Sequence, residues 1–464
     1  MHYSATDLRD TIVALSTPPG TGALAVIRLA GPRAVEVVDP FFRSKKLSEQ
    51  ASHTLHVGKL CAADGRVLDE VVVSLFLAPR SYTGDNVVEI STHGSPYIVR
   101  EVLRLFTENG ARSARPGEFT LRAFLNGRLD LSQAEAVADL IASESRTSHE
   151  LALRQMRGGF SARIAALRQQ LIDFAALIEL ELDFGEEDVE FANRDDLKKL
   201  VEDIRSVIQQ LIKSFGLGNV LRQGVPTVLA GRPNAGKSTL LNALLSEERA
   251  IVSDVAGTTR DTIEETLVID GITFRLIDTA GIRDAQDQIE AAGVARTLEK
   301  VAQSSLLVYV FDVIETPPAE VAADLANLQR PGLTIFGIAN KMDRNPYADA
   351  QTYANAYLPA ARCIPMSAKN KMNVPHLKQR LHEAVLGDAN LQDQTVVTSA
   401  RHVDALQRTL EALDATLTGM ASGVTADWVA LDIRRALHHL GEITGEISTD
   451  DLLGSIFGRF CIGK

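Results

Sequence analysis

The sequence predicts a multidomain chain in which an α/β nucleotide-binding domain is inserted into an α-helical bundle, after an N-terminal α+β domain. Three observations predict it. Residues 1–124 mix strand-like runs with turn residues, apolar stripes at helical spacing flank the centre, and the centre carries a glycine-rich loop between an apolar strand and a helix. We expect domains at 1–124, 125–220 and 221–384, with the second part of the helical domain at 385–464.

Composition excludes several classes of protein. The 464 residues are enough for about three domains, and a net charge of -12 argues against a protein that coats nucleic acid through bulk charge. The start lacks the apolar segment of a signal peptide, and no later stretch is apolar enough to span a bilayer. We therefore expect a cytoplasmic protein without a membrane partner. Cys61, Cys363 and Cys461 are too scattered for a disulfide framework or a zinc site, and we expect two of them in the core.

The N-terminal domain is expected to have strands at 11–16, 23–29, 71–77 and 86–90, because these runs are β-rich and bounded by turn residues. Helical spacing appears at 97–107, and from about residue 129 the pattern becomes helical throughout. An apolar stripe that alternates steps of four and three comprises Phe160, Ile164, Leu167, Leu171, Phe174 and Ile178.

Helices are expected on both sides of the insertion. We predict a helix at 195–215 and a linker at 216–224 that leads into the nucleotide-binding domain. The later stripes comprise Val403, Leu406, Leu410, Leu413 and Leu417, and then Val429, Ile433, Leu437 and Leu440. Because both sides show the pattern, we infer a single bundle, with the two ends of the inserted domain close together.

The loop from Gly231 to Ser238 matches the phosphate-binding pattern G-x-x-x-x-G-K-S/T, after an apolar strand and before a helix. Its amides and the helix N-terminus would face the phosphates, Lys237 would reach the β- and γ-phosphates, and Ser238 would ligate Mg2+. The nucleotide-binding residues expected here are Asn234, Ala235, Gly236, Lys237, Ser238 and Thr239.

Three further motifs follow in order, each at the end of an apolar strand. Asp278, Thr279, Ala280 and Gly281 can reach Mg2+ through water and sense the γ-phosphate. Next come Asn340, Lys341 and Asp343, and then Ser367, Ala368 and Lys369, a loop placed to close over the base. The Asp343 carboxylate suits the paired N–H donors of guanine, which adenine lacks. The sequence therefore predicts a GTP-binding domain of the Ras-like P-loop class.

The chain resembles, along essentially its whole length, the tRNA-modification GTPase family known as MnmE or TrmE. The matching stretches are the phosphate loop with Asn234, the switch stretch 256–261, the Asp278 to Gly281 motif, the run 115–119 and the terminal run 460–464.

This resemblance implies an N-terminal folate-binding and dimerisation domain, a helical domain in two segments and an inserted G domain. It implies a homodimer that joins the FAD-dependent protein MnmG (GidA) in a heterotetramer. Together they modify C5 of the wobble uridine of tRNA to an aminomethyl or carboxymethylaminomethyl group, with a one-carbon unit from a 5-formyl or methylene tetrahydrofolate. The implied folate-binding positions are Arg28, Glu89, Arg128 and Lys464.

The catalytic residues are also implied by the resemblance. Ile282 stands where Ras-like enzymes have a glutamine, and an aliphatic side chain cannot orient water. The resemblance implies that Glu290 orients the attacking water instead, and that Asn234 is a ligand of a K+ ion. It also implies a catalytic role for Lys237. The K+ shell would be completed from Ser253, Val255 and Thr258, and Thr259 would join Mg2+. The implied GTP-binding stretch is Ser253, Asp254, Val255, Ala256, Gly257, Thr258 and Thr259.

Three interpretations stay open. Cys461 in the tail is either a reactive thiol or an ordinary exposed residue, because reactivity needs a lowered pKa that no sequence reveals. Arg434, Arg435 and His438 either contact tRNA phosphates or form a solvated helix face. The alternative function is a GTPase switch in ribosome assembly, although the RNA-binding module that such proteins carry is not evident here.

Overall fold

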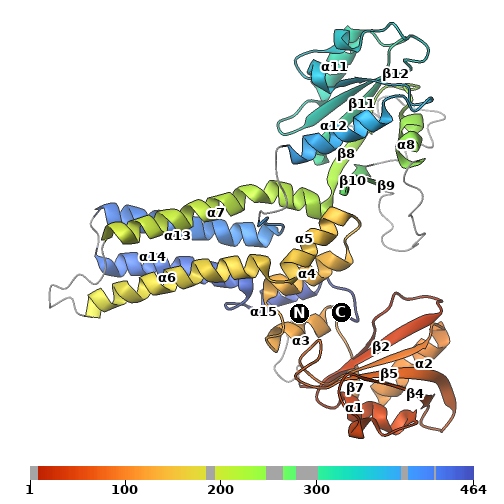
Figure 1. Ribbon diagram of the computed structural model, residues 1–464, viewed down its shortest axis with the longest axis vertical. Helices are drawn as coiled ribbons and strands as arrows, with labels where there is room; N and C mark the ends of the chain where they lie inside the picture. Colours follow the sequence, from red (N-terminus) through yellow and green to blue (C-terminus); the bar gives the residue numbers. More distant parts are fainter. Residues whose placement is uncertain (1–8, 184–193, 247–264, 278–300, 388–394, 423–424) are drawn as a thin grey trace. The chain divides into compact units, whose positions relative to one another are not determined.

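The computed structural model describes residues 9–183, 194–246, 265–277, 301–387, 395–422 and 425–464 (Figure 1). They form two compact units. The first comprises Met1–Ile141, Leu153–Gln209 and Arg401–Lys464, and the second comprises Ala142–Ala152 and Gln210–Ala400. The first unit therefore draws on both ends of the chain, whereas most of the second comes from the middle.

A seven-stranded sheet, in the order β3-β4-β5-β6-β2-β1-β7, forms the N-terminal part of the first unit. Its strands are β1 (Thr11–Leu15), β2 (Leu24–Ala30), β3 (Phe42–Arg43), β4 (Thr54–Cys61), β5 (Val67–Phe76), β6 (Val87–His93) and β7 (Ala111–Ser113). Neighbouring strands are antiparallel, except that β7 runs parallel to β1. The four strands predicted from the sequence are confirmed as β1, β2, β5 and β6, and β3, β4 and β7 are additional.

Helices α1 (Ala34–Val38) and α2 (Pro96–Glu108) pack on one face of this sheet. Their buried side chains share a core with Ile27, Val73 and Ile90. On the other face, Phe119 of α3 (Glu118–Leu125) packs against residues that include Ala14 of β1 and Val87 of β6. The remainder of that second face carries Arg28 and the residues in register with it.

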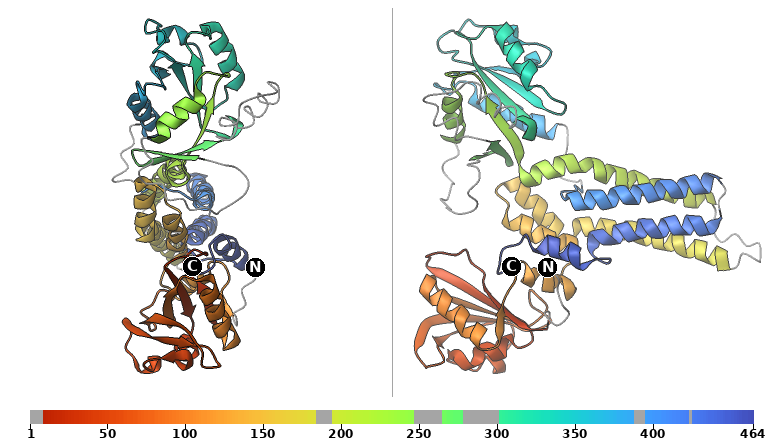
Figure 2. Two further views of the ribbon diagram at one scale, coloured as in Figure 1. Left: turned by 90° about the vertical axis from the view of Figure 1, so that its right-hand side faces the viewer. Right: turned by 180° about the vertical axis from the view of Figure 1, so that it is seen from behind.

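The helical part of the first unit is one bundle built from both ends of the chain. Its helices are α4 (Leu131–Ile141), α6 (Gly159–Asp183), the first part of α7 (Arg194–Gln223), α13 (Ala400–Ser422), α14 (Ala426–Thr444) and α15 (Asp450–Phe457). Most of α5 (Arg146–Met156) and the rest of α7 belong to the second unit. Helices α6, α7, α13 and α14 run side by side in every view (Figures 1 and 2). Ion pairs join α6 to α14 through Arg434 and Glu179, and α7 to α13 through Arg205 and Asp414.

The predicted apolar stripe of α6 is confirmed, since all six of its residues are buried. On α13 the predicted face is partly wrong. Val403, Leu410 and Leu417 are only half-buried, while Thr409 and Thr416 are fully buried. Each threonine hydroxyl donates to the carbonyl four residues earlier, at 2.8 and 2.9 Å, which satisfies it inside the bundle.

The second unit is built on a six-stranded sheet in the order β13-β12-β11-β8-β10-β9. Its strands are β8 (Val225–Ala230), β9 (Glu265–Ile269), β10 (Ile272–Ile277), β11 (Leu306–Asp312), β12 (Thr334–Asn340) and β13 (Cys363–Pro365). All pair in parallel except β9, which is antiparallel to β10. Helices α8 (Lys237–Ser246) and α12 (Val374–Leu386) share a core on one face, and α11 (Pro318–Leu328) packs on the other. This is the predicted α/β architecture.

The linker predicted at 216–224 is wrong, because α7 continues to Gln223. The apolar side chains of Leu217, Val220 and Leu221 pack into the core of the second unit, which favours a helix despite the two glycines. Gly218 is needed there, since a Cβ at this position would lie 2.1 Å from the Val397 carbonyl oxygen. The chain turns only at Gly224, whose φ is +81°.

Candidate functional site

The phosphate loop, residues 231–238, leaves the sheet at the carboxyl end of β8 and enters α8 at Lys237. Two glycines allow its path. Gly231 has a φ of +147° and a Cβ there would lie 2.0 Å from the Val310 oxygen. Gly236 has a φ of +98° and a Cβ there would lie 2.2 Å from the Asn340 Nδ2 atom. Neither position accepts a side chain, so the glycines that the motif requires have a steric cause in this fold.

Lys237 folds back across the phosphate loop. Its Nζ donates to the carbonyl oxygens of Gly231 at 2.7 Å and Arg232 at 2.8 Å. Burial lowers the pKa of this ammonium group below its ordinary value. The charge therefore sits inside the loop, in the concave space where phosphate oxygens could replace the two carbonyl contacts.

Asn340, at the end of β12, ties the phosphate loop to the base loop, which we define as Ser367, Ala368 and Lys369. Its Nδ2 donates to the Ala235 oxygen at 2.7 Å, and its Oδ1 accepts from the Ala368 amide at 3.0 Å. The side chain is 3% exposed. Both contacts are to buried backbone groups, so this asparagine fixes the spacing between the two loops.

Asp343 offers a fixed and ionised acceptor at the same edge of the sheet. Its Oδ1 accepts from the Ser367 hydroxyl at 2.6 Å. That hydrogen bond is the largest cause that lowers the pKa of the carboxyl group, and the positive charges of Lys369 and Arg344 act in the same direction. The neighbouring Lys341 is held by the buried Asp312, with Nζ and Oδ2 2.6 Å apart.

These loops enclose a pocket of about 510 Å³. It is lined by Gly236, Thr239, Asn340, Lys341, Asp343, Arg344 and Lys369. The structure thus brings residues of three separate predicted motifs into one space, at the carboxyl ends of parallel strands where α/β folds bind ligands. Its volume lies in the range of pockets for ligands of nucleotide size.

Several predicted residues lie outside the described part of the chain. They are Ser253, Asp254, Val255, Ala256, Gly257, Thr258, Thr259, Asp278, Thr279, Ala280, Gly281 and Glu290, together with Ile282. Their roles stay predictions. Strand β10 ends at Ile277, one residue before the Asp278 motif, as the sequence predicts.

A second group of predicted residues meets in the N-terminal part of the first unit. Arg28 Nη2 lies 2.7 Å from Glu89 Oε1, on paired strands. The Arg28 guanidinium lies over two aromatic rings, 5.4 Å from the centre of Tyr82 and 5.6 Å from that of Phe119. Arg128 follows α3 and is exposed beside the turn at Gly84, two residues after Tyr82.

The C-terminal tail docks on the same part of the first unit. The Lys464 oxygen accepts from the Phe119 amide at 3.2 Å, and the Cys461 oxygen accepts from the Gly117 amide at 3.4 Å. Gly463 has a φ of +97°, and a Cβ there would lie 2.1 Å from the Leu15 oxygen. The tail therefore brings Lys464 to the residue whose ring lies under Arg28. The Cys461 thiol is exposed, while Cys61 and Cys363 are buried as predicted.

The basic face predicted on α14 is paired with carboxylates. Arg434 contacts Glu179 at 2.5 Å and Arg435 contacts Asp432 at 3.2 Å. His438 lies 3.4 Å from Glu442. The pairing reduces the net positive charge of this face, and its contact with tRNA phosphates stays a prediction.

Two family models together match residues in both units. A model of the MnmE helical domain matches residues 131–461, and a model of the N-terminus of the GTP-binding protein TrmE matches residues 11–128. The chain is 55% identical over 461 residues to the tRNA modification GTPase MnmE of Cytophaga hutchinsonii, with 99% of each chain covered. The chain belongs to the MnmE family of tRNA modification GTPases.

Another MnmE, from Christiangramia forsetii, is 50% identical over 478 residues and covers 98% of this chain and 100% of its own. Among solved structures, the G domain of the T. maritima FeoB iron transporter is 23% identical over 34% of this chain and 96% of that one, with a TM-score of 0.25. Membership in the MnmE family favours tRNA modification over the alternative of a ribosome-assembly switch. None of the described helices is long and apolar enough to cross a bilayer.

Sequence reasoning missed two residues of the MnmE N-terminal domain. Tyr82 supplies a ring under Arg28, and its hydroxyl lies 2.9 Å from the Thr120 hydroxyl. No sequence signal marks Tyr82, because only the fold brings it to Arg28. Phe119 lies within the run 115–119 that carries the resemblance, but the sequence gives it no role until α3 is placed on the sheet.

Proposed function

We propose that this chain is a K+-activated GTPase that acts with the FAD-dependent protein MnmG (GidA) to modify C5 of the wobble uridine, position thirty-four, of certain tRNAs. The product carries an aminomethyl or carboxymethylaminomethyl group whose methylene comes from a tetrahydrofolate derivative. The observation that carries the GTPase part is the Asp343 carboxylate, fixed by Ser367 in the pocket that also contains Gly236 of the phosphate loop. The tRNA part is supported by the activity for which relatives in the family are named.

The described residues fit a guanine nucleotide. Two carboxylate oxygens on Asp343 match the two N–H donors of the guanine edge, and ionisation at neutral pH suits that contact because the pKa is lowered. Lys237 would exchange its two loop carbonyls for phosphate oxygens. Ser238, at the start of α8, would hold Mg2+ with Thr259, and the metal would neutralise phosphate charge.

Asn234 is the residue of the phosphate loop that we assign to K+. It is exposed on the loop, in a left-handed backbone conformation with a φ of +59°. Backbone carbonyls of Ser253 and Val255, together with Thr258, would complete the shell. When bound, K+ supplies positive charge against the charge that develops between the β- and γ-phosphates.

Water activation is assigned to a different residue. Ile282 cannot orient water, so Glu290 takes that role in this proposal, through an indirect contact. Loss of Thr259 from Mg2+ after hydrolysis would release the switch stretch and so couple the nucleotide state to tRNA modification.

The cluster around Arg28 fits the chemistry of a folate. Arg28, Arg128 and Lys464 supply cations for carboxylates, and Glu89 is an acceptor for the N–H donors of the pterin ring. The Tyr82 ring, which we add to the predicted residues, offers an aromatic surface of the kind that stacks on a flat heterocycle. The exposed Cys461 thiol is close in sequence to Lys464.

An exposed apolar region beside this cluster supports a homodimer. Strand register places Arg28, Glu89, Ser74 and Leu55 in one row across β2, β6, β5 and β4, on the face that α1 and α2 do not cover. Leu55 is 70% exposed and Val57, on the same face, is 72% exposed. A second copy would bury these side chains, and MnmG would then join the dimer in a heterotetramer.

Binding of 5-formyltetrahydrofolate to the purified chain tests the folate part. Arg28→Ala should weaken binding about 10- to 100-fold, the range expected for a lost charge-assisted contact. Arg33→Ala is the matched control, since Arg33 is an exposed arginine of the same domain that pairs only locally with Glu36. Unchanged folate affinity in Arg28→Ala would refute this site.

The tRNA part is tested by reconstitution. The chain, MnmG with FAD, GTP, a folate one-carbon donor and an amine should yield C5-modified uridine in tRNA, as measured by mass spectrometry of nucleosides. Arg28→Ala should lose this product and keep GTP hydrolysis. If the complete system with the unaltered chain yields no modified uridine, the proposed reaction is wrong.

A further inference from the structure

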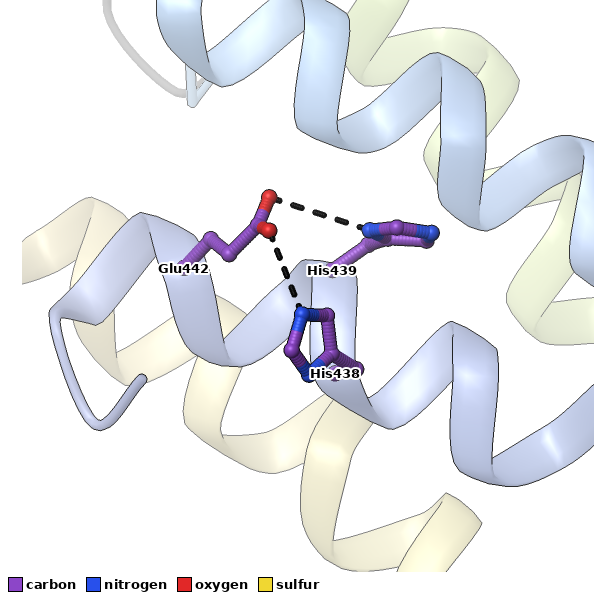
Figure 3. A group of neighbouring side chains, drawn as sticks. All are labelled: His438, His439 and Glu442. Atoms are coloured by element: carbon purple, nitrogen blue, oxygen red, sulfur yellow. Dashed lines mark ion pairs between the residues drawn. The ribbon is translucent and has the colours of Figure 1, made fainter. Parts of the chain in front are cut away.

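Helix α14 carries three side chains with donor atoms for a transition metal, in the pattern His438-His439-x-x-Glu442 (Figure 3). Glu442 lies four residues after the first histidine and three after the second, the two spacings that place helix side chains next to each other. One donor atom from each residue lies within 4.8 Å of the other two. The helix therefore brings the three groups together without help from a second element.

The distances between the donor atoms are close to those between the ligands of a metal site. Nε2 of His438 lies 3.4 Å from one oxygen of Glu442, and Nδ1 of His439 lies 3.7 Å from the other. Donor atoms about 2.0 to 2.1 Å from a tetrahedral zinc ion are separated by about 3.3 Å. Figure 3 shows the carboxylate facing both imidazoles. Rotations of the Glu442 carboxylate and of the imidazoles would close the remaining gaps, and His438, which is 52% exposed, has room to rotate.

His439 supplies the second observation. Its Nδ1 atom is buried and has no hydrogen-bond partner among the described residues. A buried nitrogen without a partner is costly in a folded protein, and a bound cation would satisfy it.

Arg408 of α13 forms an ion pair with the Glu442 carboxylate. Its Nη2 lies 3.3 Å from Glu442 Oε2. Oε2 is also the oxygen nearer to His439 Nδ1, so Arg408 shares it with that imidazole. Oε1, on the His438 side, is available as the ligand. The arginine also holds the carboxylate in place, as outer-shell partners of metal ligands do. The guanidinium charge also opposes a cation, so the affinity should be lower than at a site of the same ligands without an arginine.

We propose that His438, His439 and Glu442 bind one divalent transition-metal ion of the Zn2+ class, with water in the remaining coordination positions. Two imidazoles select Zn2+, Ni2+ or Cu2+ over Mg2+ and Ca2+, which prefer oxygen ligands. The site lies in the first unit and uses none of the residues assigned to GTP or folate, so it stands independently of the proposed function.

Calorimetric titration of the untagged, nucleotide-free full-length chain with Zn2+ tests the proposal. We expect one Zn2+ per chain at this site. The binding should weaken at least about tenfold in His438→Ala and in Glu442→Gln, since loss of even an outer-shell partner costs about 10- to 100-fold. The double variant His438→Ala/His439→Ala should abolish it. An excess of Mg2+ should not compete.

Two controls make the result specific. His376→Ala removes an exposed histidine of α12 that belongs to no such cluster in the described part of the chain. Cys461→Ser removes the exposed thiol, another group that attracts zinc. Both should bind Zn2+ like the unaltered chain. Equal circular dichroism and melting temperature without metal would show that the variants fold. Undiminished binding in the double variant, or loss of binding in Cys461→Ser, would overturn the assignment.

Discussion

Replacing Asn340 by alanine should uncouple the phosphate loop from the base loop. The Asn340 side chain is buried and bonds one backbone group of each loop, the Ala235 oxygen at 2.7 Å and the Ala368 amide at 3.0 Å. Alanine removes both partners at once and leaves no group in their place. The base loop and the phosphate loop should then fluctuate independently, and GTP affinity should fall.

The size of the effect follows from these two contacts. A buried backbone group that loses its partner costs about 1 to 3 kcal/mol. For the Ala368 amide alone, this range corresponds to a roughly 5- to 150-fold loss of protection from hydrogen exchange, if exchange occurs through local opening. Both loops contribute to one pocket, so we expect GTP affinity to fall at least about tenfold.

Hydrogen exchange followed by mass spectrometry, resolved to the Ala368 amide, measures this directly. Asn355→Ala is the matched control in the same unit. Asn355 also bonds backbone groups, the amides of Tyr357 and Leu358, but it does not line the pocket. It should leave both Ala368 protection and GTP affinity unchanged. The reasoning is refuted if protection of Ala368 in Asn340→Ala stays within about twofold of the unaltered chain.

Two further predictions concern single charges. Asp343→Asn should weaken GTP binding at least about 100-fold and favour the binding of xanthosine triphosphate. The reason is that an amide can donate a hydrogen bond to the carbonyl that replaces the guanine amino group. Competition binding measures both affinities. Glu135 has a pKa lowered to about 2: burial would raise it, but His402 and Arg401 outweigh that effect. Its folded pKa lies below its ordinary value of 4.5, so its stabilisation is present above that value and is lost as pH falls towards 2. Melting temperatures of Glu135→Gln should therefore decline less steeply over this window than those of the unaltered chain, and parallel curves would contradict the assignment.

Local sequence signals were sufficient for most of the nucleotide site. The glycine positions of the phosphate loop, the ends of β8 and β12, and the Asp343 acceptor follow from motifs that occupy strand ends. The hydrogen bonds by which Asn340 joins the two loops do not follow from these motifs. The bond to the phosphate loop joins residues more than a hundred positions apart in the chain, so only the sheet order β12-β11-β8 reveals it.

The errors have equally specific causes. Gly216 and Gly218 suggested a linker, yet burial of Leu221 and its neighbours continues α7 through them. On α13 an apolar stripe predicted the buried face, but Thr409 is buried there because its hydroxyl bonds the helix backbone. In both cases tertiary packing outweighs the preference of single residues, which a reading by composition and spacing cannot weigh.

GTP hydrolysis by the purified chain, with K+ or Na+ as the only monovalent cation at matched ionic strength, tests the central claim most directly. We predict hydrolysis that is strongly faster in K+, and loss of that difference in Asn234→Ala while GTP still binds. Equal rates in K+ and Na+, or an unchanged K+ dependence in Asn234→Ala, would contradict the account.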